Sequence, residues 1–200
     1  VIYRMVDKVV ALSRIDVTFW QNYCPAYYIP NPIDIPSKEQ VSNLDAVNVL
    51  WVGRISPEKR PEAIIEAFEM VHYEVPEARL IMVGEGDSDE DLKKLQKKAK
   101  ELEIEDCIEF EGFQKNVDIY YREAAVLTIT SKCESFSMVL AESKGYGVPT
   151  VMYELPNLEL VRDGKGVISV PQNDVYSLAT GIINLLKNRV LREECGRQAR

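Results

Sequence analysis

The stretch Glu134-Ser-Phe-Ser-Met-Val-Leu-Ala-Glu142-Ser-Lys-Gly-Tyr-Gly-Val-Pro-Thr150 decides the fold, because it joins two apolar segments. The β-branched run at 124–130 and the run at 148–153 each predict a buried strand. Between them, residues 138–146 have helical character, with Ser135 or Ser137 as the N-cap and Gly147 with Pro149 as a stop signal. In an open α/β sheet, the turn of such a strand–turn–helix–strand unit lies at the carboxyl ends of the strands, where ligands bind.

Two carboxylates mark this unit. Glu134 lies in the turn, whereas Glu142 lies on a helical stripe whose other members, Met138, Ala141 and Gly145, are apolar or small. A carboxylate on a buried stripe is costly unless it is hydrogen-bonded, and the two hydroxyls of a ribose would satisfy it. The alternative is a partly exposed Glu142 that bonds to a neighbouring loop.

Outside this unit the chain alternates between the two patterns. Strands are predicted at 47–52, 79–83, 107–110 and 166–170, and helices at 61–73, 90–102, 117–123, 158–162 and 173–187. Such alternation requires a parallel sheet with crossover helices. The predicted fold class is therefore α/β, with a doubly wound parallel sheet.

A second segment whose side chains could bind a ligand is Val49-Leu-Trp-Val-Gly53-Arg54-Ile-Ser-Pro-Glu-Lys59-Arg-Pro-Glu-Ala-Ile-Ile-Glu-Ala-Phe68. Arg54 and Lys59 flank a turn after a strand, and Gly53 allows close backbone approach. Two cations there can hold a diphosphate by charge-assisted hydrogen bonds. We expect Arg60 to be a surface residue.

The two segments together resemble retaining, nucleotide-sugar-dependent glycosyltransferases of the GT-B fold, family 4 in particular. The first matches the family's Glu-x7-Glu signature and the second its strand–Gly-Arg-x4-Lys–helix element, over roughly residues 45–190. The resemblance implies a Rossmann-like C-terminal half that binds a nucleoside-diphosphate sugar as donor substrate. It also implies transfer without a metal ion or other cofactor.

The resemblance assigns roles to individual residues. Glu134 would contact the donor sugar, Glu142 the ribose, and Arg54 and Lys59 the diphosphate, whose charge grows as the glycosidic bond breaks. The remaining donor-binding candidates are Gly53, the start of the helix with its backbone N–H groups (Ser135, Phe136, Ser137, Met138), and the nucleobase pair Phe113 and Gln114. Phe113 as a plain core residue is the alternative. Members of the family often have Gly where Ser135 and Ser137 stand, so the identity of the donor sugar is the feature that this departure affects.

Composition limits the partners. The net charge of −8 argues against nucleic acid and anionic membranes as broad partners. Four scattered cysteines (Cys24, Cys107, Cys133, Cys195) and a single histidine predict reduced thiols, no metal site and a cytoplasmic location. No apolar run is long enough to span a bilayer, although a longer protein could contact a membrane peripherally.

Four segments are predicted along the chain. Residues 1–30 would be the last strand (7–13) and helix (16–23) of an N-terminal domain, 31–46 a linker, 47–190 the nucleotide-sugar-binding domain, and 191–200 the start of a truncated helix. The chain begins without methionine, so we expect a missing N-terminal, acceptor-binding domain. Alternatively, residues 1–30 could decorate a single domain.

The predicted function is therefore the donor-binding half of a retaining glycosyltransferase, which moves a sugar to a polysaccharide, lipid or glycan precursor. The isolated chain is expected to bind donor without transferring it. Two alternatives remain: a nucleotide-sugar epimerase or hydrolase of the same fold, and a non-catalytic nucleotide-binding module.

Overall fold

Six parallel strands form the main sheet, in the order β5-β4-β3-β6-β7-β8. The computed structural model describes residues 6–37, 41–42, 44–155 and 157–200. The strands of the sheet are β3 (Asn48–Val52), β4 (Arg79–Val83), β5 (Ile108–Gly112), β6 (Ala124–Ile129), β7 (Thr150–Tyr153) and β8 (Val167–Val170). This is the doubly wound order, with the first strand of the sheet in the middle. The predicted α/β fold class is confirmed.

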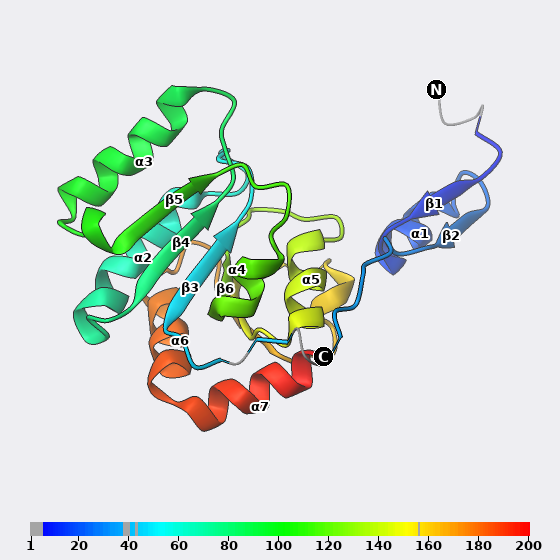
Figure 1. Ribbon diagram of the computed structural model, residues 1–200. Coiled ribbons are helices and arrows are strands. Elements are labelled where there is room, and N and C mark those ends of the chain that lie inside the picture. The colour runs from blue at the N-terminus through cyan, green and yellow to red at the C-terminus, as the bar shows by residue number, and fades with distance from the viewer. Residues whose placement is uncertain (1–5, 38–40, 43, 156) are drawn as a thin grey trace.

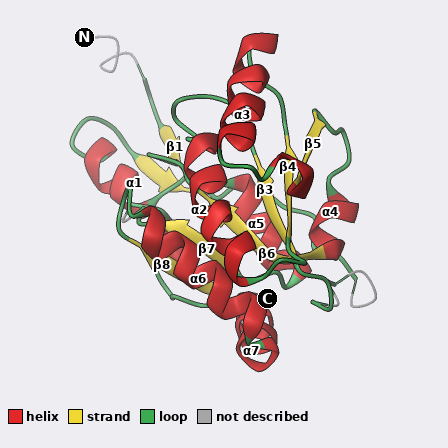
Figure 2. Cartoon of the chain, turned by 90° about the vertical axis from the view of Figure 1, so that its left-hand side faces the viewer, coloured by secondary structure: helices red, strands yellow, loops and turns green. Residues whose placement is uncertain are grey.

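Helices cover both faces of this sheet (Figures 1 and 2). They are α2 (Pro61–Glu74), α3 (Asp89–Glu101), α4 (Asp118–Glu123), α5 (Met138–Tyr146) and α6 (Val175–Lys187), with short 3-10 turns η3 (Glu105–Cys107) and η4 (Glu159–Val161). Because successive side chains of a strand point to opposite faces, Val49 and Trp51 of β3 pack with α2, α3 and α6, whereas Leu50 packs with α4 and α5. The strands are therefore buried on both sides, as parallel strands require.

The N-terminal segment forms its own two-stranded parallel sheet. It consists of β1 (Val9–Ala11), α1 (Arg14–Trp20) and β2 (Ala26–Tyr28), and Figure 1 shows it set apart from the main sheet. The side chain of Arg14 forms an ion pair with Glu159 at 3.3 Å, with the Arg14 side chain 65 % exposed, so this contact adds little stability.

The last helix, α7 (Arg189–Ala199), packs against α5 and α6 and begins two residues before the predicted position 191. Its Arg192 is 4 % exposed, and the guanidinium donates to the carbonyls of Leu44, Leu185 and Leu186 at 2.7–3.0 Å. Those bonds satisfy a buried charge and fix the helix to the end of α6.

The predicted element boundaries differ from the structure by a few residues for local reasons. The helix expected from 16 begins at Arg14, because the Ser13 hydroxyl caps it by accepting from the Asp16 amide at 3.1 Å. The strand expected from 148 begins at Thr150, after Pro149, which has no N–H to donate to the sheet. No helix in the described ranges combines the length and the apolar character that a bilayer crossing needs.

Candidate functional site

The strand order reverses between β3 and β6, and the loops after these two strands meet at the carboxyl edge of the sheet. One loop runs from Gly53 to Arg60 and the other from Thr130 to Ser137. In doubly wound sheets, ligands bind in the crevice at this reversal point. The two predicted motifs therefore lie next to each other at one edge of the sheet.

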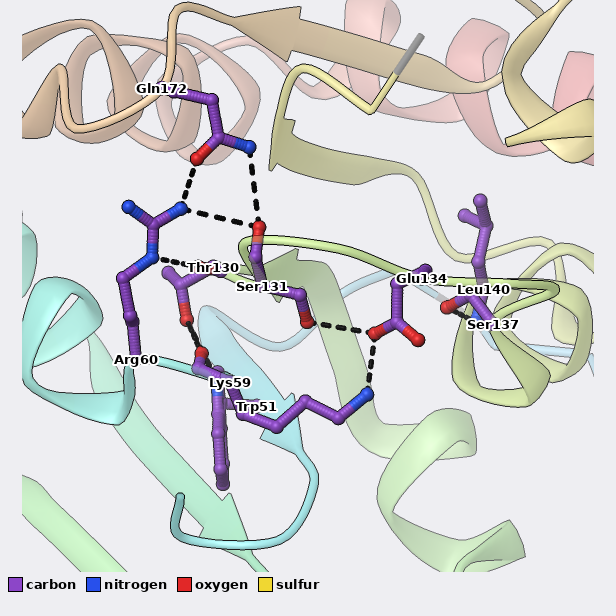
Figure 3. A network of polar contacts seen from close by, with 9 residues as sticks. All are labelled: Trp51, Lys59, Arg60, Thr130, Ser131, Glu134, Ser137, Leu140 and Gln172. Atoms are coloured by element: carbon purple, nitrogen blue, oxygen red, sulfur yellow. Dashed lines mark hydrogen bonds and ion pairs between the residues drawn. The ribbon is translucent and has the colours of Figure 1, made fainter. Parts of the chain in front are cut away.

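An ion pair joins the loops. The Lys59 Nζ atom lies 2.6 Å from Oε1 of Glu134, and the Ser131 hydroxyl donates to the same oxygen at 2.7 Å (Figure 3). The side chains of Lys59 and Glu134 are 29 % and 12 % exposed, so both can still reach a ligand while solvent screening is reduced. The pair holds one cation and one carboxylate side by side.

Thr130 holds the backbone of Lys59 in place. The Thr130 hydroxyl donates to the Lys59 carbonyl at 2.6 Å and accepts from the Trp51 indole N–H at 3.1 Å. A further backbone bond runs from the Lys132 amide to the Glu58 carbonyl at 2.8 Å. The loops are thus bonded to each other through both side chains and backbone.

A cavity of about 360 Å³ opens on the β4 side of this junction. Gly53, Arg54, Phe113 and Gln114 line it, as do two glycines after β4. Phe113 is 67 % exposed, so the core alternative for this residue is wrong. The Gln114 side-chain amide donates to the Glu111 carbonyl at 2.9 Å. That bond fixes the direction of the Gln114 side-chain oxygen.

Glu142 lies in a second cavity of about 690 Å³. Its Oε2 accepts from the Tyr121 hydroxyl at 2.8 Å, and Tyr121 belongs to helix α4, so the alternative of a neighbouring loop as the bonding partner is wrong. Burial raises the pKa of the Glu142 carboxyl, and the Tyr121 hydrogen bond opposes that rise. Val117 lines both cavities, so the two are neighbours.

Helix α5 begins at this site with a strained cap. Ser137 has φ 62° and ψ 82°, in the left-handed region, and its hydroxyl accepts from the Leu140 amide at 3.4 Å. Of the two serines predicted as N-cap, Ser137 is therefore the cap. Ser135 and Met138 are exposed, whereas Phe136 is 5 % exposed, so Phe136 can offer a ligand only its backbone.

Arg60 corrects the prediction of a plain surface residue. Its guanidinium donates to the carbonyl of Thr130 at 3.0 Å and to that of Ser131 at 3.3 Å, and also bonds the side chains of Gln172 and Asn173. The local sequence, three consecutive charges, gives no signal of this, because the partners lie at least 70 residues away.

Four residues that the sequence analysis did not assign to the site also contribute to it: Gly84 and Gly86, which line the smaller cavity, Ser131, and Tyr121. Gly84 and Gly86 could have been found from their place directly after a predicted strand. Within the described ranges, no group of three or more His, Cys, Asp or Glu residues is arranged to hold a metal ion.

The chain is similar to known proteins in sequence and in fold. The family model "Glycosyl transferases group 1" matches residues 34–200. An uncharacterized glycosyltransferase of Haemophilus influenzae is 27% identical over 187 residues, which cover 91% of this chain and 52% of that protein. The poly(glycerol-phosphate) alpha-glucosyltransferase of Bacillus subtilis is 27% identical, over 86% of this chain and 26% of that protein.

A solved structure has the same fold. A mutant of S. aureus TarM, in complex with fondaparinux, alpha-GlcNAc-glycerol and UDP, superimposes with a TM-score of 0.87 at 19% identity, covering 98% of this chain and 40% of that one. The chain spans about half, or less, of the length of these relatives.

Proposed function

Because the chain belongs to the glycosyl transferases group 1 family, we propose that it is the nucleotide-sugar-binding half of a retaining glycosyltransferase. The observation that carries the proposal is the Lys59–Glu134 ion pair at the carboxyl edge of β3 and β6, with a cavity for a nucleotide beside it. A cation for phosphate and a carboxylate for sugar hydroxyls are the two groups that a sugar diphosphate needs at its reactive bond.

The diphosphate is proposed to lie between Arg54, Lys59 and the first turn of α5. Arg54 is exposed in the smaller cavity, and the N–H groups at the start of α5 add partial positive charge. In a chain of net charge −8, such local positive charge is what attracts the anion. During transfer, these groups stabilise the charge that develops on the leaving nucleoside diphosphate.

Glu134 is proposed to orient the sugar rather than attack it. A carboxylate whose Oε1 already accepts from Lys59 and Ser131 has reduced nucleophilicity, whereas its Oε2 can accept from a sugar hydroxyl. This role fits retention of configuration without a covalent glycosyl-enzyme. Holding the ring near the geometry of the transition state acts on the chemical step.

The nucleoside is proposed to span the two neighbouring cavities. Glu142 would accept from the ribose hydroxyls, and Phe113 and Gln114 would contact the base. The Tyr121 bond uses Oε2 of Glu142, so Oε1 can serve the ligand. The TarM complex contains UDP, and we therefore propose UDP as the first nucleotide to test.

Residues 1–30 and the linker 31–46 are proposed to connect to an N-terminal domain that binds the acceptor, a polysaccharide, lipid or glycan precursor. The partial coverage of the relatives supports this arrangement. The isolated chain would then bind donor without transferring it.

The experiment that tests the proposal is a thermal-shift screen of the chain with UDP, GDP, ADP, CDP and dTDP. A nucleotide at about 100 times its dissociation constant adds about 2.7 kcal/mol to the free energy of unfolding, which raises the melting temperature measurably. If no nucleoside diphosphate raises it, the proposal is wrong. In a longer protein, release of the nucleoside diphosphate only when an acceptor is present separates a transferase from an epimerase or a hydrolase.

A further inference from the structure

Arg60 occupies a conformation that its residue type disfavours. It precedes α2 with φ 47° and ψ 57°, in the left-handed region, where residues other than Gly are strained. Such strain persists where the surrounding structure over-determines the residue. The contacts of the Arg60 guanidinium account for its strained backbone conformation.

Those contacts tie three loops together. Nε donates to the Thr130 carbonyl at 3.0 Å, and Nη2 donates to the Ser131 carbonyl at 3.3 Å (Figure 3). The other bonds reach the side chains of Gln172 and Asn173, in the loop between β8 and α6. The guanidinium also stacks 4.9 Å from the ring centroid of Tyr153, at the end of β7.

Gln172 also donates hydrogen bonds to the backbone around this site. Its amide donates to the Ser131 carbonyl at 3.3 Å and to the Glu154 carbonyl at 2.8 Å. The Ser131 backbone is therefore held by both Arg60 and Gln172, while the Ser131 hydroxyl holds Glu134 at 2.7 Å. A continuous set of hydrogen bonds thus runs from the β8–α6 loop to the Glu134 carboxylate.

We propose that Arg60 is a positioning residue, which fixes the Thr130–Ser131 backbone so that Glu134 and Lys59 stay paired at the donor sugar. This inference rests on the function proposed above. Arg60 itself need not touch the donor. Arg60 follows Lys59 directly in the sequence. Its side chain therefore holds the loop that carries Lys59 against the loop that carries Glu134.

The chemistry of the contacts explains why arginine serves here. Two backbone carbonyls on consecutive residues and two side-chain oxygens lie around one planar group, and only a guanidinium offers enough donors in a fixed fork. A lysine could satisfy part of this set from a flexible stem. Lysine at this position should therefore rescue part of the function.

The variants are Arg60→Gly, Arg60→Lys and, as a matched control, Arg197→Ala. Glycine suits the left-handed backbone, so Arg60→Gly removes the guanidinium and relieves strain at the same time, which favours retention of the fold. Arg197 lies on α7 with its side chain 75% exposed, in an ion pair with Glu194. Affinities for UDP and UDP-glucose are measured by calorimetry, amide hydrogen exchange is followed over residues 130–137, and melting temperatures are recorded.

We expect Arg60→Gly to weaken UDP-glucose binding by about tenfold to a hundredfold and UDP binding by less than about threefold, because UDP lacks the sugar that Glu134 contacts and the Thr130 hydroxyl still holds the Lys59 carbonyl. Exchange over 130–137 should become faster, Arg60→Lys should lie between parent and Arg60→Gly, and Arg197→Ala should match the parent.

Three outcomes overturn the inference. Unchanged UDP-glucose affinity and unchanged exchange in Arg60→Gly would show that the loop does not need the guanidinium. Equal losses for UDP and UDP-glucose, with a lowered melting temperature, would show a general structural role. A parent chain that binds neither probe would contradict the proposed donor site itself, and that outcome is distinguished by the first titration.

Discussion

At the scale of single residues, Glu134 and Glu142 are the same side chain in two environments. Glu134 lies beside a cation, whereas the contact of Glu142 is a neutral Tyr121 hydroxyl in a partly buried cavity. Two identical groups in different surroundings are suited to different tasks. The distinction between sugar and ribose contacts is therefore testable by substituting one carboxylate at a time.

Glu134→Gln should weaken binding of the intact nucleotide sugar by about 1.5–3 kcal/mol, the value of a hydrogen bond to a charged group. UDP alone should bind as tightly as to the parent, or slightly more tightly, because Lys59 loses the carboxylate that neutralises it. Glu142→Gln should instead weaken uridine, UDP and UDP-glucose alike. Calorimetry of both variants against the three ligands measures the difference. Equal losses of UDP and UDP-glucose in Glu134→Gln would place that carboxylate at the nucleotide.

Glu142 should also leave a signature in the pH dependence of stability. Burial raises the pKa of its carboxyl in the folded chain above the usual value of 4.5, so the folded state binds that proton more tightly than the unfolded state. Its contribution therefore favours folding at low pH and is lost as pH rises through the raised pKa. Glu142→Gln cannot ionise and still offers an oxygen to Tyr121.

The melting temperature of Glu142→Gln minus that of the parent should consequently increase between about pH 4.5 and pH 7, as the parent carboxyl ionises. Subtraction cancels the titration of carboxylates that do not interact with Glu142, which both proteins share; Asp118 does interact with it. A difference that is flat over this range, or that falls with rising pH, would contradict the raised pKa.

At the scale of elements, the site is built by loops at strand ends. Features that depend on neighbouring residues could be predicted from the sequence, whereas contacts between residues far apart in the chain could not. The strands, turns and helix starts of both motifs were predicted from the sequence because turn, cap and strand signals are local, whereas the roles of their residues came from the family resemblance. Arg60 was misassigned because its partners Thr130, Ser131 and Gln172 come from other elements. The partner of Glu142 was also missed, because helix α4 reaches it only through tertiary packing. Periodicity predicts an element but not which other elements it meets.

A substitution at Gly84 tests the packing of two strand ends that line the smaller cavity. It has φ +137°, and a Cβ built on it would lie 1.8 Å from the Gly53 carbonyl oxygen. Gly84→Ala should therefore lower the free energy of unfolding by about 3 kcal/mol or more, since neither the backbone angle nor the space suits alanine. Urea unfolding measures the change.

Gly164→Ala is the matched control for Gly84. Gly164 also has positive φ, +65°, but no atom lies within 4 Å of the built Cβ. It should cost only about 1–2 kcal/mol, the value of left-handed strain alone. Equal costs for the two variants would show that the close approach of Gly84 to Gly53 contributes nothing.

At the scale of the whole molecule, one doubly wound sheet supports the site, while the β1–α1–β2 segment lies apart from it. The strand order could be expected from the alternation of strand and helix, because parallel sheets leave few topologies open. The position of the N-terminal segment could not, because short strands carry no signal for the partner with which they pair. The assignment of residues 1–30 to a different domain stays a proposal.

The central claim is that this chain binds a nucleoside diphosphate through Arg54 and Lys59. The most direct test is calorimetric titration of UDP and of uridine into the parent, Arg54→Ala, Lys59→Ala and the control Lys97→Ala, a lysine 78% exposed on α3. We predict that Arg54→Ala and Lys59→Ala each lose about 1.5–3 kcal/mol of UDP binding, while uridine binds all four proteins equally. UDP binding that is as tight to both variants as to the parent, or absent from the parent, would contradict the account.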